Sequence, residues 1–82
     1  MSEYFFDKRI IEKQYYKSGQ LAFKIKYKNG KPHGFEKHYF ESGLLRYIAQ
    51  YKNGKPHGVE MEFNEIGNII KKRFYKNGLM KE

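Results

Sequence analysis

Hydrophobic and polar residues alternate along most of this chain. Leu21, Phe23, Ile25 and Tyr27 stand two residues apart, with lysine or alanine between them. The same alternation recurs in segments 35–40, 45–51, 59–63 and 69–75. A period of two is typical of β-strands, whereas an amphipathic helix repeats its apolar residues every three to four positions. The pattern therefore predicts strands of about six to eight residues and no helix.

Turn signals separate these segments at a regular spacing. All eight glycines follow one period of 24 residues, and the string YKNGKPHG occurs at 27–34 and again at 51–58. Asn-Gly between alternating segments is the strongest local signal for a β-hairpin, and Ser-Gly at 18–19 and 42–43 marks a second turn. The predicted turn residues are Gly19, Asn29, Gly30, Gly34, Gly43, Asn53, Gly54, Gly58, Gly67, Asn77 and Gly78.

Consecutive strands joined by hairpins predict an all-β fold. We expect a single-layer, twisted antiparallel β-meander of about six strands, built from 24-residue hairpin repeats. One domain would span residues 1–82. It would comprise a degenerate repeat at 4–26, repeats at 27–50 and 51–74, and a partial capping repeat at 75–82.

The strand register follows if the apolar residues of every strand share one face. Tyr27 would then lie opposite Phe35, and Tyr39 opposite Leu45. Opposite charges would meet on the outer face, which stabilises a sheet by about 0.2–1 kcal/mol for each pair. The expected charge pairs are Glu12 with Lys24, Glu36 with Lys26, and Glu60 with Lys72.

Composition narrows the class of protein. The net charge of +8 leans toward disorder, but aromatic residues make up 18% of the chain and favour an ordered, β-rich domain. The absence of cysteine excludes thiolate zinc sites and thiol catalysis. No apolar run is long enough to span a membrane, and the N-terminal residues do not resemble a signal peptide. These features predict a cytoplasmic location.

Two surfaces are candidates for binding. The Asn-Gly turns carry basic residues along one rim of the sheet, and this basic rim consists of Lys28, Lys31, His33, Lys52, Lys55, His57 and Lys76. It serves solubility, or it docks an acidic protein or nucleic acid. An apolar patch on the outer face would contact a partner or a second copy in a homodimer, and it consists of Phe40, Leu44, Ile48, Ile70 and Phe74.

Catalytic and metal-binding arrangements are not apparent. Ser18 and Ser42 belong to the rim opposite His33 and His57, so no nucleophile–base pair forms. The two histidines lie two strands apart, about 10 Å, without further ligands. We expect each imidazole to donate to a turn carbonyl or to pack on a tyrosine. The sequence thus predicts no enzyme activity, no cofactor and no metal; Glu60 and Glu62 are explained by ion pairing.

The repeated string resembles a known family. Y-K-N-G-K-x-H-G, followed by an aromatic residue, a glycine and a further Leu or Ile, is similar to the MORN-repeat variant found in bacterial antitoxin and immunity proteins of the YwqK type. The resemblance covers Tyr27 to Gly78 well and Tyr4 to Tyr27 loosely. It implies an elongated sheet that binds a protein partner, such as a toxin. The alternative function is a nucleic-acid-binding module that uses the basic rim, with tyrosines stacking on bases.

Overall fold

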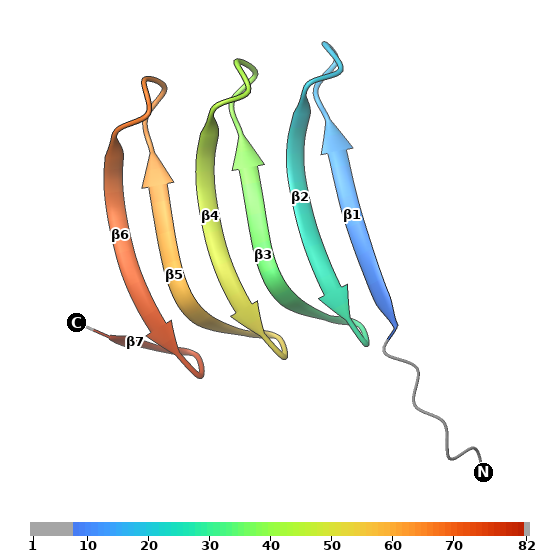
Figure 1. Cartoon of the computed structure of the whole chain (residues 1–82), viewed down its shortest axis with the longest axis vertical. Helices are drawn as coiled ribbons and strands as arrows, with labels where there is room; N and C mark the ends of the chain where they lie inside the picture. The colour runs from blue at the N-terminus through green and yellow to red at the C-terminus, as the bar shows by residue number, and fades with distance from the viewer. Residues whose placement is uncertain (1–7, 82) are drawn as a thin grey trace.

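The computed structural model describes residues 8–81, which form one antiparallel sheet in sequence order (Figure 1). The molecule is 10 Å deep along its shortest axis, so it consists of a single layer. This confirms the predicted all-β meander; a short seventh strand was not expected. The strands are β1 (Arg9–Tyr15), β2 (Leu21–Lys28), β3 (Lys31–Tyr39), β4 (Leu45–Lys52), β5 (Lys55–Phe63), β6 (Ile69–Lys76) and β7 (Leu79–Lys81).

The Asn-Gly turns form the lower rim of the sheet in Figure 1. In the first of them, Lys28 pairs directly with Lys31, which leaves a loop of two residues. Asn29 has φ 52° and Gly30 has φ 81°. Two-residue hairpin turns of the primed type require positive φ at both central positions, and asparagine tolerates this conformation better than other side chains. The sequence therefore makes this turn locally.

The turns set a register different from the predicted one. A two-residue turn makes its flanking residues direct partners, so Tyr27 lies opposite Pro32 and not opposite Phe35. Tyr39 does lie opposite Leu45, as expected. All three expected charge pairs are wrong by one residue. The observed partners are Glu12 with Ile25, Glu36 with Ile25 and Ala49, and Glu60 with Ala49 and Arg73.

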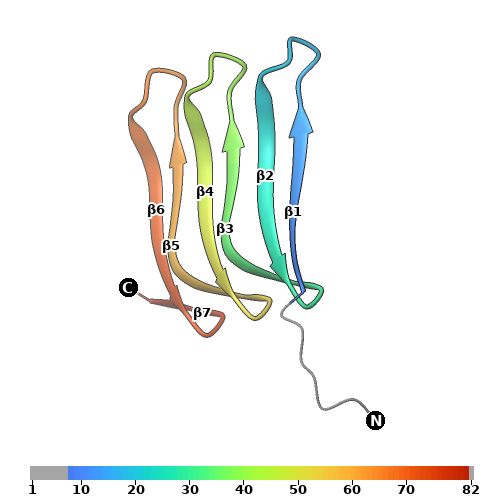
Figure 2. The same ribbon diagram turned by 45° about the vertical axis from the view of Figure 1, so that its right-hand side comes forward.

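The β2–β3 pair and the β4–β5 pair each contain an irregularity near the lower rim. Between the pairs Tyr27–Pro32 and Ile25–Glu36, β2 has one residue, Lys26, whereas β3 has three. Gly34 lies in this bulge with φ 99°. As a result, the first residues of β3 and β5 run sideways along the lower rim before the strand turns upward (Figures 1 and 2).

The register gives the sheet two faces of different character. Residues that are directly opposite each other point to the same side of a sheet. One side, here named the tyrosine–glutamate face, carries Glu12, Phe23, Ile25, Tyr27, Glu36, His38, Tyr47, Ala49, Tyr51, Glu60, Glu62, Arg73 and Tyr75. The other, here named the lysine face, carries Ile11, Lys13, Lys24, Lys26, Phe35, Lys37, Ile48, Val59, Met61, Lys72 and Phe74.

The core is small because the sheet has no second layer. Among the described residues only Ile25 and Ala49 are buried hydrophobics, with 6% and 5% of their surface exposed. Both lie on the tyrosine–glutamate face, in the row that runs across the middle of the sheet. Phe35, Val59 and Met61 were expected on this face and lie on the other one.

Hydrogen bonds join each lower turn to the repeat before it. The amide of Gly54 donates to the Pro32 carbonyl and that of Gly78 to the Pro56 carbonyl, both at 2.8 Å. The amide of Asn53 donates to Nδ1 of His33 at 3.2 Å, and that of Asn77 to Nδ1 of His57 at 3.2 Å. The Pro-His pair of YKNGKPHG therefore binds the Asn-Gly pair of the next copy.

Candidate functional site

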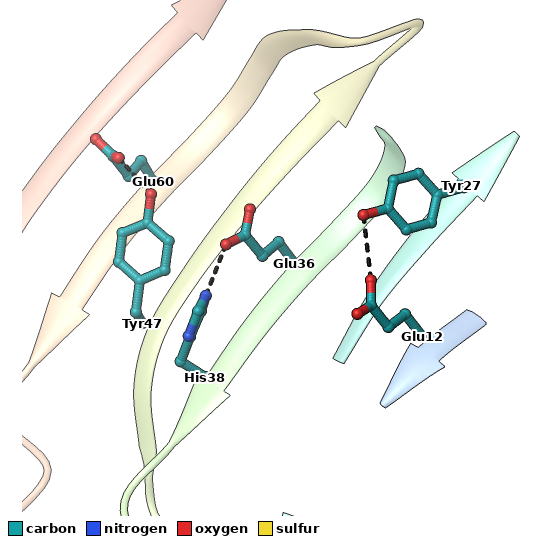
Figure 3. Close-up of polar contacts among 6 residues, drawn as sticks. All are labelled: Glu12, Tyr27, Glu36, His38, Tyr47 and Glu60. Atoms are coloured by element: carbon teal, nitrogen blue, oxygen red, sulfur yellow. Dashed lines mark hydrogen bonds and ion pairs between the residues drawn. The ribbon is translucent and has the colours of Figure 1, made fainter. Parts of the chain in front are cut away.

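Tyrosine hydroxyls bind the glutamates in the middle of the tyrosine–glutamate face (Figure 3). Tyr47 donates to Glu60 at 2.6 Å, and Tyr27 donates to Glu12 at 3.3 Å. Glu60 also accepts from Tyr75 and from the guanidinium of Arg73, each at 3.4 Å. These carboxylates stand beside Ile25 and Ala49, where an unpaired charge would cost free energy, so the hydroxyls satisfy them.

His38 occupies the centre of the same face. Its Nε2 lies 2.6 Å from a carboxylate oxygen of Glu36. Its ring lies 4.7 Å from the Phe23 ring and 5.4 Å from the Tyr47 ring, measured between centroids. The apolar alternation did not predict this cluster, because it placed Glu36 on the outer face. The turn-determined register was the signal that could have found it.

Electrostatics reinforce the hydrogen bond between Tyr47 and Glu60. Burial, followed by the hydrogen bond to Glu60, raises the pKa of the Tyr47 hydroxyl well above its ordinary value. The same hydrogen bond is the main cause that lowers the pKa of the Glu60 carboxyl, and Arg73 adds to it, while desolvation opposes the shift. Burial and the Glu36 charge raise the pKa of Tyr51. The folded protein thus favours neutral tyrosines beside ionised glutamates.

Tyr47→Phe is expected to lower the free energy of unfolding at neutral pH by about 1–2 kcal/mol, because a half-buried carboxylate loses its shortest donor. The depressed pKa of Glu60 means that this stabilisation exists above the carboxyl pKa of the unfolded chain, about 4.3, and disappears as pH falls below it. The raised pKa of Tyr47 means that it also disappears as pH rises beyond about 10. Urea unfolding across this pH range measures both limits.

Tyr75→Phe is the matched control for this prediction. It removes a hydroxyl that donates to the same carboxylate at 3.4 Å, so its effect should be smaller. If Tyr47→Phe lowered the free energy of unfolding by the same amount at every pH, the hydrogen bond between Tyr47 and Glu60 would not depend on the charge of Glu60.

An open depression of about 400 Å³ lies on the tyrosine–glutamate face. Its lining residues are Glu36, His38, Arg46, Tyr47 and Glu62. Glu60 and Glu62 share this face, although Glu60 was expected on the outer face, and Glu60 lies opposite Arg73 rather than Lys72. Its hydrogen bonds to Tyr47, Tyr75 and Arg73 give Glu60 a structural role.

The basic rim is partly a packing device. Lysines flank the turns as direct partners, Lys28 with Lys31 and Lys52 with Lys55. The stem of Lys31 lies against Gly54 of the next turn, and the stem of Lys55 lies against Gly78. Long side chains of this kind cover surface with their methylenes while the ammonium group stays in water. The lysines therefore support the joints and present charge at the same time.

The rim histidines are turn acceptors, which corrects the expectation that they donate to a carbonyl. Nδ1 of His33 and of His57 accepts the amide of an asparagine in the next turn. This requires Nδ1 to be unprotonated, so the remaining ring proton is on Nε2. In the part of the chain that the structure describes, no group of three or more potential ligands could hold a metal ion.

The two faces differ in charge, since the described glutamates are absent from the lysine face, whereas Lys71 and Arg73 stand with glutamates on the opposite face. Lys13, Lys24 and Lys37 stand directly opposite one another on three adjacent strands of the lysine face. The lysines of the basic rim continue this surface downward. Lys24, Lys26 and Lys28 are two residues apart along β2, so their side chains point to the same face. None of the described acidic residues lies on the lysine face. They are Glu12, Glu36, Glu60 and Glu62 on the opposite face, and Glu41 and Glu65 in the upper turns.

The predicted apolar patch does not form one surface. Ile48 and Phe74 belong to the lysine face, where they lie opposite Met61 and Val59 respectively. Ile70 is the extra residue of a bulge between the pairs Glu62–Lys71 and Phe63–Ile69. Phe40 and Leu44 flank an upper turn, in which the amide of Phe40 donates to the carbonyl of Leu44. The five residues do not share a face because Phe40 and Leu44 lie outside the strands and the bulge at Ile70 interrupts the alternation of β6.

Comparison with known proteins gave one match. The sequence model of the MORN repeat variant matches residues 10–29, 32–53 and 56–77. Neither a search of curated proteins nor a search of solved structures returned a match. Over residues 8–81, no helix has the length and hydrophobicity to cross a membrane.

MORN repeats are non-enzymatic modules that generally bind proteins or membranes. The three matched segments each contain one long hairpin of the sheet and together cover most of the chain. The hairpin repeats, the single layer and the sequence match agree, and this chain belongs to the MORN repeat variant family.

Proposed function

We propose that this protein is an antitoxin- or immunity-type binding module that occludes an acidic surface of a partner protein. The observation that carries the proposal is the uneven distribution of charge: most of the described lysines lie on one face and its lower rim, and the described glutamates lie elsewhere. Like charges directly opposite each other destabilise a sheet. An acidic partner would neutralise them, and a potential of one sign speeds association with such a partner.

The lysine face also offers apolar contact area. Phe35 and Phe74 are exposed hydrophobics on this face, and Ile48 and Met61 lie between Lys37 and Lys72 in the neighbouring row. The ammonium of Lys37 lies 5.8 Å from the centre of the Phe35 ring, and that of Lys72 lies 5.3 Å from the Phe74 ring. Aromatic residues among charges are typical of the energetically dominant part of a protein interface.

Nucleic acid is the second candidate, and the same lysines favour it. The tyrosines that were expected to stack on bases point away from the lysine face, and the hydroxyls of Tyr27, Tyr47 and Tyr75 bind glutamates. The tyrosines thus offer bases no stacking surface beside the lysines, which leaves Phe35 and Phe74 for that role and weakens the case for a single-stranded nucleic acid.

Charge reversal on the lysine face tests the proposal. Lys24→Glu combined with Lys37→Glu is expected to weaken binding to the partner protein about tenfold or more. The partner would be captured from the native host, identified, purified and titrated by calorimetry, and its toxicity tested by co-expression. Lys17→Glu with Lys71→Glu is the matched control, because it changes net charge equally at positions away from this face. Equal affinities for both double variants would contradict the proposal.

Random-sequence DNA serves as the competing probe. Steep loss of DNA affinity with rising salt, restricted to chains with an intact lysine face, would favour the nucleic-acid function instead. No detectable DNA binding at low salt would remove it.

A further inference from the structure

We infer that the two outer edges of this sheet bind each other, so that a second copy of the chain adds its β1 to β6 of the first. Among residues 8–81, no strand pairs with the outer side of β1 from Ile10 to Tyr15, and β7 covers β6 only from Phe74 to Lys76. The outer side of β6 from Ile69 to Arg73 therefore presents backbone amides and carbonyls that another strand could pair with.

The direction and length of the strands fit this contact. β1 runs in the same direction as β3, β5 and β7, so it is antiparallel to β6 (Figure 1). In the 24-residue repeat, β7 is equivalent to the first three residues of β5. β1, two repeats earlier than β5, is equivalent to the part of β5 that begins at His57. β7 of one copy followed by Ile10–Tyr15 of the next would thus make one strand of the length of β5. Lys8 and Arg9 of the second copy, which lie beside Asn29 and Lys28 at the lower rim, would then yield this place to β7.

The repeat fixes the register of the proposed contact. β4 pairs with β5 through Tyr47–Glu62, Ile48–Met61 and Ala49–Glu60. In the proposed contact, β6 takes the place of β4, and β1 of the second copy takes the place of β5. The equivalent pairs are then Lys71 with Gln14, Lys72 with Lys13, and Arg73 with Glu12 of the second copy.

Charge at the two edges is complementary in this register. Ile25 and Ala49 each stand between two glutamates of the same row, whereas Arg73 has Glu60 on one side only. Glu12 of the second copy would lie on the other side of Arg73, so that Arg73 would also stand between two glutamates. Lys72 would face Lys13, an arrangement that the chain already contains between Lys13 and Lys24.

Exposed hydrophobic side chains gather at the same two edges. They are Ile10, Ile11 and Tyr15 on β1, and Ile69, Ile70, Phe74, Leu79 and Met80 on β6 and β7. Tyr15 is 59% exposed, while its equivalents Tyr39 and Phe63 on interior strands are half-buried. Within residues 8–81, no further strand lies beyond these edge residues. The two edges differ from each other, so the contact is heterologous and can repeat into longer assemblies.

Disulfide trapping tests the register directly, since the chain has no native cysteine. Lys13→Cys with Lys72→Cys, and Gln14→Cys with Lys71→Cys, place cysteines opposite each other between copies. Within one copy they stand five strands apart, about 24 Å, which no disulfide can bridge. Both double variants should yield a ladder of linked dimers and longer oligomers on oxidation.

The matched controls use the same four cysteines in the other combinations. Lys13→Cys with Lys71→Cys, and Gln14→Cys with Lys72→Cys, point the thiols to opposite faces, so the ladder should be lost. Equal ladders in all four variants, or none in the first two, would overturn the proposal.

A charge swap provides an independent readout by analytical ultracentrifugation. The unmodified chain should gain average mass with concentration. Arg73→Glu and Glu12→Arg should each shift toward monomer, and an equimolar mixture of the two should recover the association, while Lys24→Glu and Glu41→Arg change nothing. Circular dichroism checks that each variant is folded. A monomer at every concentration up to about 1 mM, or a mixture that does not associate, would refute the contact.

Discussion

Gly58→Ala is expected to be among the most destabilising single substitutions in this protein, lowering the free energy of unfolding by about 2–4 kcal/mol. Gly58 lies in the bulge of β5 with φ 109°, a conformation in which a side chain is strained. A methyl group there would also overlap the side-chain amide of Gln50, which must then move. For a domain of this size, each kcal/mol lowers the melting temperature by about 4–8 °C, so thermal unfolding measures the effect.

Gly34→Ala separates the two causes. Gly34 occupies the same place in β3 with φ 99°, but a methyl group there would meet the Lys26 stem at an ordinary 3.6 Å. Its cost should therefore be backbone strain alone, about 1–2 kcal/mol. Gln50→Ala in the Gly58→Ala background should bring that variant close to Gly34→Ala. Equal losses in the two single variants would show that Gln50 does not matter.

Ile25→Ala is expected to cost about 2–4 kcal/mol, because it removes one of the two buried hydrophobic residues of the described sheet. Its neighbours in the row are Glu12 and Glu36, so the lost methylenes would also expose two carboxylates to a new cavity. Chemical denaturation with urea measures the change. The loss should appear without a change in the m-value, because the overall surface exposed on unfolding stays similar.

Ile48→Ala is the matched control, with the same chemistry on a central strand of the opposite face. Ile48 is half-buried on the lysine face, so its truncation should cost about 1 kcal/mol. A loss as large as that of Ile25→Ala would contradict the assignment of the small core to the tyrosine–glutamate face.

The sequence predicted the architecture because the repeat determines it. The 24-residue glycine period and the Asn-Gly signals predicted the meander, and the strands formed where the alternation placed them. The error lay in choosing between two sources of register. The prediction aligned apolar residues across strands, whereas the pair Lys28–Lys31 shows that the short turn decides.

That single shift accounts for most of what the sequence did not reveal. It moved Glu36 and Glu60 from an outer surface to the side of Ile25 and Ala49, where tyrosine hydroxyls bind them. It moved Phe35 to the lysine face. The role of His57 as an acceptor depends on the sideways path of the strand after Pro56, which no alternation pattern encodes.

The hydrogen bonds from each lower turn to the preceding Pro-His pair have a thermodynamic consequence. They link every hairpin to its immediate neighbours only, so the molecule behaves as a one-dimensional chain of coupled units rather than as a cooperative globule. Its ends should fray first, and amide exchange should be slowest in β3 and β4. A partner lying across several strands would suppress this fraying, so that binding and stiffening of the sheet become one event.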